Sequence, residues 1–198
     1  MEKRNFQIMM ENQIKNIEGK PRLLLHSCCA PCSSAVLEIL VKKFEVTLFF
    51  YNPNISPEAE FLKRAEEQKR LLNEAGYDIK IVIPPYDENE FFDAVSGLEK
   101  EAEGGARCSV CFRLRLEKCA EYARENGFDF FTTTLSVSPH KNAQILNSIC
   151  EELSEKYGVS NLYADFKKKN GYKRSCELSE KYGLYRQDYC GCIFSVRG

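Results

Sequence analysis

Residues 23–34 read Leu23-Leu24-Leu25-His26-Ser27-Cys28-Cys29-Ala30-Pro31-Cys32-Ser33-Ser34. The three leucines are typical of a strand that is covered on both faces. The proline suits the first turn of a helix, where its missing N–H does no harm. Because ligands of open α/β folds bind at the carboxyl ends of strands, the stretch predicts three thiols at a binding edge of a sheet.

Segments typical of strands and helices alternate along the chain. Strands are expected at residues 22–27, 45–51, 78–83 and 129–135, and helices at 31–43, 58–75, 87–95, 108–126 and 138–157. Four strand–helix alternations at these spacings predict one parallel α/β sheet with flanking helices. We expect a single domain over 1–198, with an N-terminal helix at 1–19 and an irregular C-terminal extension at 159–198. The extension should carry a short helix near 175–182.

The composition limits the class of protein. The chain has 198 residues, a formal net charge of −1 and 43% hydrophobic residues, enough for a core without metal or disulfide support. The sequence has no run of 18 apolar residues and no secretory signal, which predicts a cytoplasmic protein without a membrane partner. In a reducing compartment, ten cysteines are expected to be metal ligands or redox groups rather than disulfides.

Two cysteine pairs have the C-x-x-C spacing, Cys29/Cys32 and Cys108/Cys111, and Cys28 adjoins the first pair. At the start of a helix, residues i and i+3 share a face, and the helix N-terminus lowers thiol pKa values. The pairs predict a metal centre with thiolate ligands, either zinc or an iron–sulfur cluster. Because the chain has its own core and the turn ends a strand, the pattern favours a cluster over a structural zinc.

The first turn holds one thiol more than a four-ligand centre needs. Either Cys28 and Cys29 both bind one cluster, or one of them holds a second metal ion. Three other cysteines stand alone in the sequence and are expected to be small buried side chains, namely Cys119, Cys150 and Cys176.

A third cysteine group, Cys190-Gly191-Cys192, lies near the C-terminus. Its two sulfurs approach each other only if the middle residue bends sharply, which glycine permits. The spacing predicts either a labile dithiol/disulfide pair or two further metal ligands. Asp188 and Tyr189 beside it are candidate hydrogen-bonding or acid groups.

Five spaced motifs carry a family resemblance. They are His26-x-Cys28-Cys29-Ala30-Pro31-Cys32, Tyr51-Asn52-Pro53-Asn54, Arg107-Cys108-x-x-Cys111, Thr132–Leu135 with Ser138-Pro139-His140-Lys141, and Tyr189-Cys190-Gly191-Cys192. With these motifs in order over nearly the whole chain, the sequence resembles the QueH-type epoxyqueuosine reductases. The resemblance implies a Rossmann-like parallel sheet of the nucleotide α-hydrolase (HUP) type. It also implies a cobalamin-independent iron–sulfur oxidoreductase that performs the last step of queuosine synthesis, reducing epoxyqueuosine to queuosine at the tRNA wobble position.

The same resemblance implies roles for the cysteines. A 4Fe-4S cluster would be bound by Cys28, Cys29, Cys108 and Cys111, with Cys190 and Cys192 as the redox pair. Cys32 also matches the family pattern, without an assigned role.

Conversion of an epoxide to an alkene needs two electrons and two protons. A 4Fe-4S cluster passes one electron at a time, so a second redox partner is required. That partner is either the dithiol or an additional iron ion that binds the epoxide oxygen as a Lewis acid. Tyr189, Asp188 or His140 would donate protons. The electron donor is a separate partner that the sequence does not identify.

A tRNA partner requires phosphate contacts although the chain is almost neutral. Five cations fall within residues 167–174, and others flank the second cysteine pair or follow His140. Phe166 and Tyr172 are candidates to stack an extruded base. The alternative for the lysine run is a solvated charged face. The predicted RNA-binding residues are Arg113, Arg115, Lys141, Lys167, Lys168, Lys169 and Arg174.

Two other functions stay open on the residues alone. One is a non-catalytic zinc module that binds RNA. The other is an ATP-dependent tRNA-modifying enzyme of a related fold, in which a Gly/Ser-rich loop after the first strand would bind pyrophosphate. Residues 28–32 occupy that position and offer no glycine for close approach of the backbone to phosphate.

Overall fold

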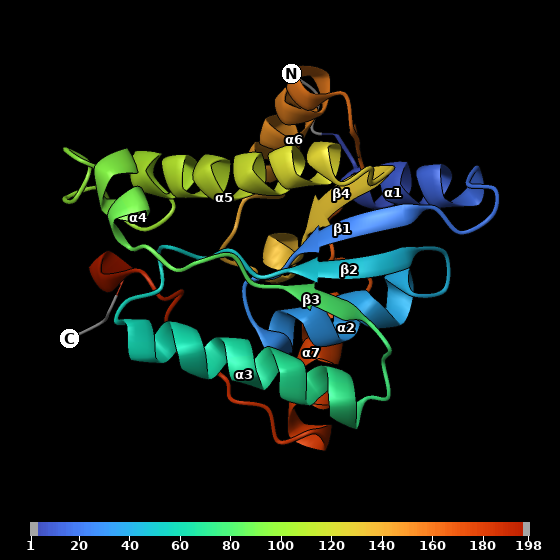
Figure 1. Cartoon of the computed structure of the whole chain (residues 1–198), viewed down its shortest axis with the longest axis horizontal. Coiled ribbons are helices and arrows are strands. Elements are labelled where there is room, and N and C mark those ends of the chain that lie inside the picture. Colours follow the sequence, from blue (N-terminus) through green and yellow to red (C-terminus); the bar gives the residue numbers. More distant parts are fainter. Residues whose placement is uncertain (1–3, 196–198) are drawn as a thin grey trace.

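The computed structural model describes residues 4–195. Its centre is a parallel sheet in the order β3-β2-β1-β4-β5, whose strands are drawn as arrows in Figure 1. The strands are β1 (Arg22–His26), β2 (Glu45–Phe49), β3 (Lys80–Val82), β4 (Phe130–Thr133) and β5 (Ser160–Asn161). The predicted parallel α/β sheet is therefore confirmed, and β1 is its central strand.

Helices cover both faces of this sheet (Figure 1). Leu24, Phe49 and Phe131 pack against α5 (Ala106–Glu125) and α6 (Ala143–Tyr157). Leu23 and Leu25 point to the other face, toward α2 (Ala30–Leu40) and α1 (Phe6–Lys15). Successive side chains of a strand alternate between faces, so the leucine run fills both cores at once. Helices α3 (Glu58–Glu74), α4 (Asn89–Ala94) and α7 (Gly171–Lys181) complete the layers, with short 3₁₀ turns η1 (Thr134–Val137) and η2 (Ile193–Ser195).

Several boundaries differ from the sequence-based expectation. The extension at 159–198 is more regular than predicted, because it adds the fifth strand and an 11-residue helix, α7, that packs against α2. Helix α6 begins at Ala143 rather than 138, since the Asn142 side chain caps it by accepting from the Gln144 amide at 2.9 Å. The N-terminal helix is shorter than 1–19, and residues 1–3 lie outside the described part. Within residues 4–195, no helix combines the length and the apolar character that crossing a bilayer requires.

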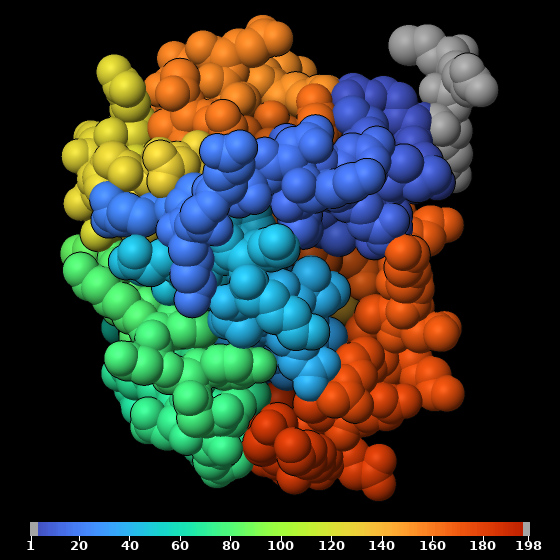
Figure 2. Space-filling model, turned by 90° about the vertical axis from the view of Figure 1, so that its right-hand side faces the viewer, coloured from blue at the N-terminus to red at the C-terminus, as the bar shows by residue number. Residues whose placement is uncertain are grey.

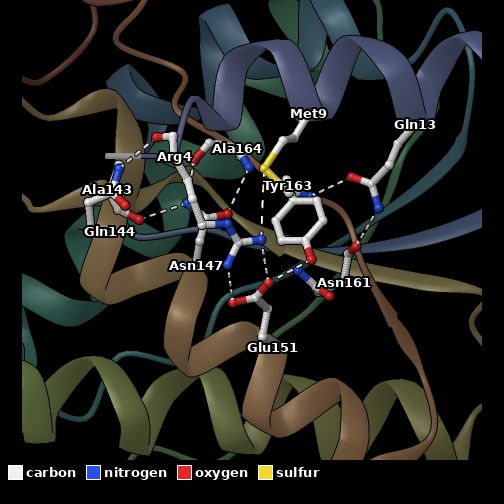
Figure 3. Close-up of polar contacts among 10 residues, drawn as sticks. All are labelled: Arg4, Met9, Gln13, Ala143, Gln144, Asn147, Glu151, Asn161, Tyr163 and Ala164. Atoms are coloured by element: carbon white, nitrogen blue, oxygen red, sulfur yellow. Dashed lines mark hydrogen bonds and ion pairs between the residues drawn. The ribbon is translucent and has the colours of Figure 1, made fainter. Parts of the chain in front are cut away.

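Polar contacts fix α1 to the β5 edge of the sheet (Figure 3). Arg4 donates to both carboxylate oxygens of Glu151 at 2.6 and 2.8 Å, and Tyr163 donates to the same carboxylate at 2.6 Å. Gln13 donates to the Asn161 carbonyl at 3.0 Å and accepts from the Tyr163 amide at 2.9 Å. These contacts hold α1 and the chain after β5 in one position relative to α6.

Asn147 makes the buried part of this attachment. Its amide donates to the carbonyls of Ala143 and Ala164 at 2.7 and 2.8 Å, and its oxygen accepts from the Ala164 amide at 3.0 Å. Asn147→Ala should lower the free energy of unfolding by about 2–3 kcal/mol, because both Ala164 backbone groups lose their partner in a buried place. Urea unfolding measures this, with exposed Asn73→Ala as the control. Equal effects of the two substitutions would contradict the assignment.

Candidate metal centre and redox site

The cysteine turn lies at the carboxyl end of β1, as the sequence predicts. Cys29 caps α2 in an extended conformation, and a proline follows in the first turn. The sulfurs of Cys28 and Cys29 are 3.8 Å apart, and those of Cys28, Cys29 and Cys32 all lie within 4.8 Å of one another. The structure thus places Cys32, whose role the sequence leaves open, with the other two thiols in one compact donor set.

Buried polar contacts hold the turn. His26 is fully buried, with Nδ1 2.9 Å from Thr133 Oγ1 and Nε2 3.1 Å from the Tyr51 carbonyl. Because a carbonyl only accepts, Nε2 carries the proton and Nδ1 accepts from the threonine hydroxyl. Burial lowers the pKa of His26 to about 3, so the ring is neutral. It links the ends of three neighbouring strands rather than serving as an acid.

The residues that flank the turn are tied to α3. The hydroxyls of Ser27 and Ser33 lie 2.7 Å from each other and 2.7 and 2.9 Å from Gln68 Oε1. Asn52 donates to the Ser27 carbonyl at 2.8 Å. The backbone on both sides of the three thiols therefore has buried partners, which fixes where the sulfurs point.

The second cysteine pair lies at the start of α5, beside the first. Cys108 and Cys28 pack against the same part of the core. Cys108 accepts from the Gly104 amide at 3.2 Å, and Cys111 is buried, which raises the pKa of its thiol. Among residues 4–195 the two do not join the compact set of three sulfurs, but they line a cavity that adjoins it.

The C-terminal group closes this region. Cys190 lines both the 310 Å³ cavity that holds the first three thiols and the smaller cavity that holds Cys108 and Cys111. Cys192 lines the smaller one. The loop is attached by backbone contacts: Ser56 donates to the Gly191 carbonyl at 3.0 Å, and Asn54 to the Cys190 carbonyl at 3.4 Å. The structure thus brings all three predicted cysteine groups to two adjoining cavities.

Thiol ionisation is uneven in this region. Hydrogen bonds from Cys29 and Cys32 lower the pKa of Cys28 well below its ordinary value, and its thiolate raises the pKa values of the other two. In the C-terminal pair, a hydrogen bond from Cys192 lowers the pKa of Cys190 to about 4, while that of Cys192 rises. In the turn and in the C-terminal pair alike, one thiol is therefore favoured as the thiolate over its neighbours.

Other predicted site residues lie around the larger of the two sulfur cavities, the one of 310 Å³ that the first three thiols line. Asp188, Tyr189, His140, Lys141 and Arg115 all line it. Burial opposes the charge of Lys141, but the negative charge of the neighbouring cysteines, Cys28 first and Cys190 among them, outweighs this and raises its pKa. Arg115 is buried and donates to the Cys111 carbonyl at 3.1 Å.

The remaining predicted RNA-binding cations lie elsewhere. Arg113 pairs with Glu152, Lys167 with Asp165, Lys169 with Glu11, and Arg174 with Glu38 and Glu177. Together with Lys168, the last two line a separate cavity between α1, α2 and α7. Their role in RNA binding stays a prediction.

The structure corrects one base-stacking candidate. Phe166 is 2% exposed and belongs to the core, whereas Tyr172 is 42% exposed and lines the larger cavity. Cys119 and Cys150 are buried as expected, but Cys176 is half-buried.

Sequence reasoning missed Arg64. It is 2% exposed, lines the larger cavity, donates to Glu60 at 2.7 Å and lies 5.1 Å from the Tyr189 ring. Arg64 and Gln68 interrupt the apolar stripe of α3 that Phe61, Ala65 and Leu72 form. Polar residues on a buried helix face are a signal for a polar site, and this signal was present in the sequence.

Comparisons with known proteins place the chain in a protein family. The family model described as epoxyqueuosine reductase QueH matches residues 23–198. The chain belongs to the QueH family. Epoxyqueuosine reductase QueH of Streptococcus pyogenes is 41% identical over 99% of this chain and 80% of the relative. The Staphylococcus epidermidis protein of that name is 42% identical over 89% and 77%, and the Haemophilus influenzae protein 43% over 91% and 74%.

One solved structure supports the fold. The U34-tRNA thiolase NcsA from Methanococcus maripaludis, determined with its [4Fe-4S] cluster, superposes with a TM-score of 0.59. The likeness covers 97% of this chain and 67% of the thiolase, at 14% sequence identity. The predicted family and the HUP-type fold are both confirmed, whereas the predicted roles of individual QueH cysteines stay predictions.

The buried histidine gives a pH-dependent prediction. Below about pH 6.5, His26 is protonated in the unfolded chain but stays neutral in the folded chain. The free energy of unfolding therefore decreases as the pH falls. The stability advantage of wild type over His26→Gln should therefore shrink by up to about 1.4 kcal/mol per pH unit between about pH 6 and 4. Urea unfolding of both proteins across this range measures it. A difference that does not change with pH would contradict a neutral buried His26.

Gly191 gives a second prediction. Its φ is +101°, and an added Cβ would lie 2.7 Å from Ile55 Cγ1 and 3.2 Å from Arg64 Nη1. Gly191→Ala should displace the loop, so that the pH midpoint of Cys190 alkylation rises from about 4 toward that of a free thiol. Peptide mass spectrometry measures the midpoint. Gly183→Ala is the control, since Gly183 has a φ of +54° but open space around it. An unchanged midpoint in Gly191→Ala would show that the loop tolerates a side chain.

Proposed function

We propose that this chain reduces the epoxide of epoxyqueuosine at the wobble position of tRNA, giving queuosine. The convergence of three cysteine groups on two adjoining cavities carries the proposal. The reaction needs two electrons, and a cluster that passes one electron at a time requires a second redox partner beside it. Membership of the QueH family supports it and disfavours both a zinc RNA module and an ATP-dependent enzyme. A tRNA substrate also favours the cytoplasm.

The thiols of the turn and of the start of α5 suit a 4Fe-4S cluster. Iron–sulfur clusters are held by cysteine thiolates, and the turn and the start of α5 present them from two elements that share one part of the core. Cys28, Cys29, Cys108 and Cys111 would hold the cluster, which supplies single electrons. Cys32 is then the surplus thiol, and an additional iron ion beside the cluster is part of the proposal.

The C-terminal pair would supply the two electrons. The Cys190 thiolate and the Cys192 thiol together give two electrons and one proton, and Tyr189 gives the second proton. The epoxide then becomes an alkene, its oxygen leaves as water, and the pair becomes a disulfide. The Cys190 thiolate is stabilised by the Cys192 thiol and by Ser195 Oγ at 3.2 Å. Burial raises the pKa of Tyr189, which keeps its proton available near neutral pH, and Asp188 lines the same cavity.

The larger cavity would receive the modified base. Lys141 and Arg115 on its wall provide positive charge for the tRNA, and exposed Tyr172 offers a ring for stacking. Electrons must enter from a separate donor, because the dithiol is consumed in each turnover.

Iron analysis combined with turnover tests the roles of the cysteines. Cys28→Ser and Cys108→Ser should lose most of the iron and sulfide of anaerobically purified protein, because each removes a ligand. Cys190→Ser and Cys192→Ser should keep the iron and lose turnover by at least about 10³-fold, because a thiol pair that is part of the reaction acts as a unit. Mass spectrometry of tRNA nucleosides measures turnover.

Half-buried Cys176→Ser on α7 is the matched control and should change neither quantity. Loss of iron in the Cys190 and Cys192 variants would make these residues ligands instead. A wild-type protein that holds iron but leaves epoxyqueuosine unchanged with a strong chemical reductant would overturn the proposed function.

A further inference from the structure

A third cavity, of about 690 Å³, lies between α1, α2 and the chain from Phe166 to Glu177. We call it the α1–α2–α7 groove. Figure 2 shows the segments that form it, with α1 in dark blue, the end of α2 in lighter blue and the later segment in orange. Its floor is apolar, made by Met10, Ile14, Ala35, Ile39 and Phe166. Nothing in the reaction proposed for the cysteines uses it.

The rim of the groove is positively charged. Six cations stand there against three carboxylates, Glu11, Glu38 and Glu177, and ion pairs join these acids to Lys169 and Arg174. Among the described residues, four of the cations have no ion-pair partner: Lys15, Lys43, Lys168 and Lys173. A partner that covers this rim must itself be acidic.

The chemistry of the groove favours a protein over a nucleic acid. Interfaces between proteins combine an apolar centre with a polar rim. Surfaces that bind nucleic acid are more polar and much more positive, and those for single strands present exposed aromatic rings. Here the one aromatic ring of the lining, Phe166, is buried, and carboxylates are interspersed with the cations.

The groove is separated from the cysteines by the packed helices α2 and α7. Helix α2 has Cys32 in its first turn, in the larger sulfur cavity, and Ala35 and Ile39 in the groove. Helix α7 likewise has Tyr172 in the sulfur cavity and Lys173 in the groove. The rise from Cys32 to Ile39 is about 10 Å, and a helix is about 10 Å across, so a bound protein would lie one helix layer from the thiols.

We propose that the α1–α2–α7 groove binds a small acidic electron-transfer protein. This inference rests on the proposed function, which consumes two electrons per epoxide. Two one-electron-reduced carriers each lose one electron, and with two protons these electrons restore the Cys190–Cys192 disulfide to the dithiol. The positive rim suits a transient redox encounter steered by charge.

Charge reversal on one wall of the groove tests this. Lys15→Glu/Lys43→Glu changes two exposed, unpaired cations, one on α1 and one in the turn after α2, that lie outside the predicted RNA-binding stretch. The probe is a plant-type [2Fe–2S] ferredoxin, an acidic one-electron carrier kept reduced by NADPH and its reductase. At low salt, its Kd for the iron-loaded variant should rise at least about tenfold, equivalent to about 1.4 kcal/mol.

The ferredoxin-driven rate at limiting ferredoxin should fall by a similar factor. Turnover with dithionite should stay within about twofold of wild type, which also shows that the variant folds. The matched control is Lys20→Glu/Lys80→Glu, which makes the same charge change at exposed lysines away from the groove.

The apolar floor has its own pair of variants. Ile39→Gln places a polar group in the groove, whereas Ile8→Gln changes an isoleucine of α1 that is exposed but does not line it. Ile39→Gln should weaken ferredoxin binding about three- to tenfold, and Ile8→Gln should not.

Three results would overturn the inference. They are a wild-type protein that neither binds reduced ferredoxin nor turns over with it, equal effects of groove and control variants, and a tRNA Kd that rises while ferredoxin binding is unchanged. The last would assign the groove to RNA. Failure of the proposed function gives a different result, because wild type would then be inactive with dithionite as well.

Discussion

The site depends on one constraint: a turn of three thiols must be held rigidly at the carboxyl end of the central strand. Neutral His26 joins the ends of β1, β2 and β4, while Ser27 and Ser33 share the oxygen of Gln68. These polar groups are buried, so breaking one contact leaves a partner unsatisfied. That cost makes the turn a fixed donor set rather than a mobile loop.

The other parts of the site are arranged around this turn. Helix α5 places Cys108 and Cys111 beside it. The C-terminal loop is held there by hydrogen bonds from the Ser56 amide and the Asn54 side chain to its carbonyls. Negative charge on the thiolates is balanced by Lys141 on the wall of the cavity. The groove on the other side of α2 and α7 gives the same thiols a second approach, distinct from the cavity proposed for the tRNA base.

Much of this could be predicted from the sequence, because the informative signals are local. The leucine run, the proline after the turn and the cysteine spacings each depend on a few neighbouring residues, and they located the sheet and all three thiol groups. Two-residue β5 has no pattern of its own and forms only by pairing with β4. The burial of Phe166, and the division of the cations between two cavities, depend on how α1 and α7 pack, which no local pattern records.

Iron location tests the central claim most directly. Crystals of anaerobically purified protein, measured on both sides of the iron absorption edge, give a map of iron alone. The account predicts iron density at the carboxyl end of β1, between the first turns of α2 and α5 and beside Cys190. Iron density remote from that edge, or a loaded protein with zinc there instead, would contradict it.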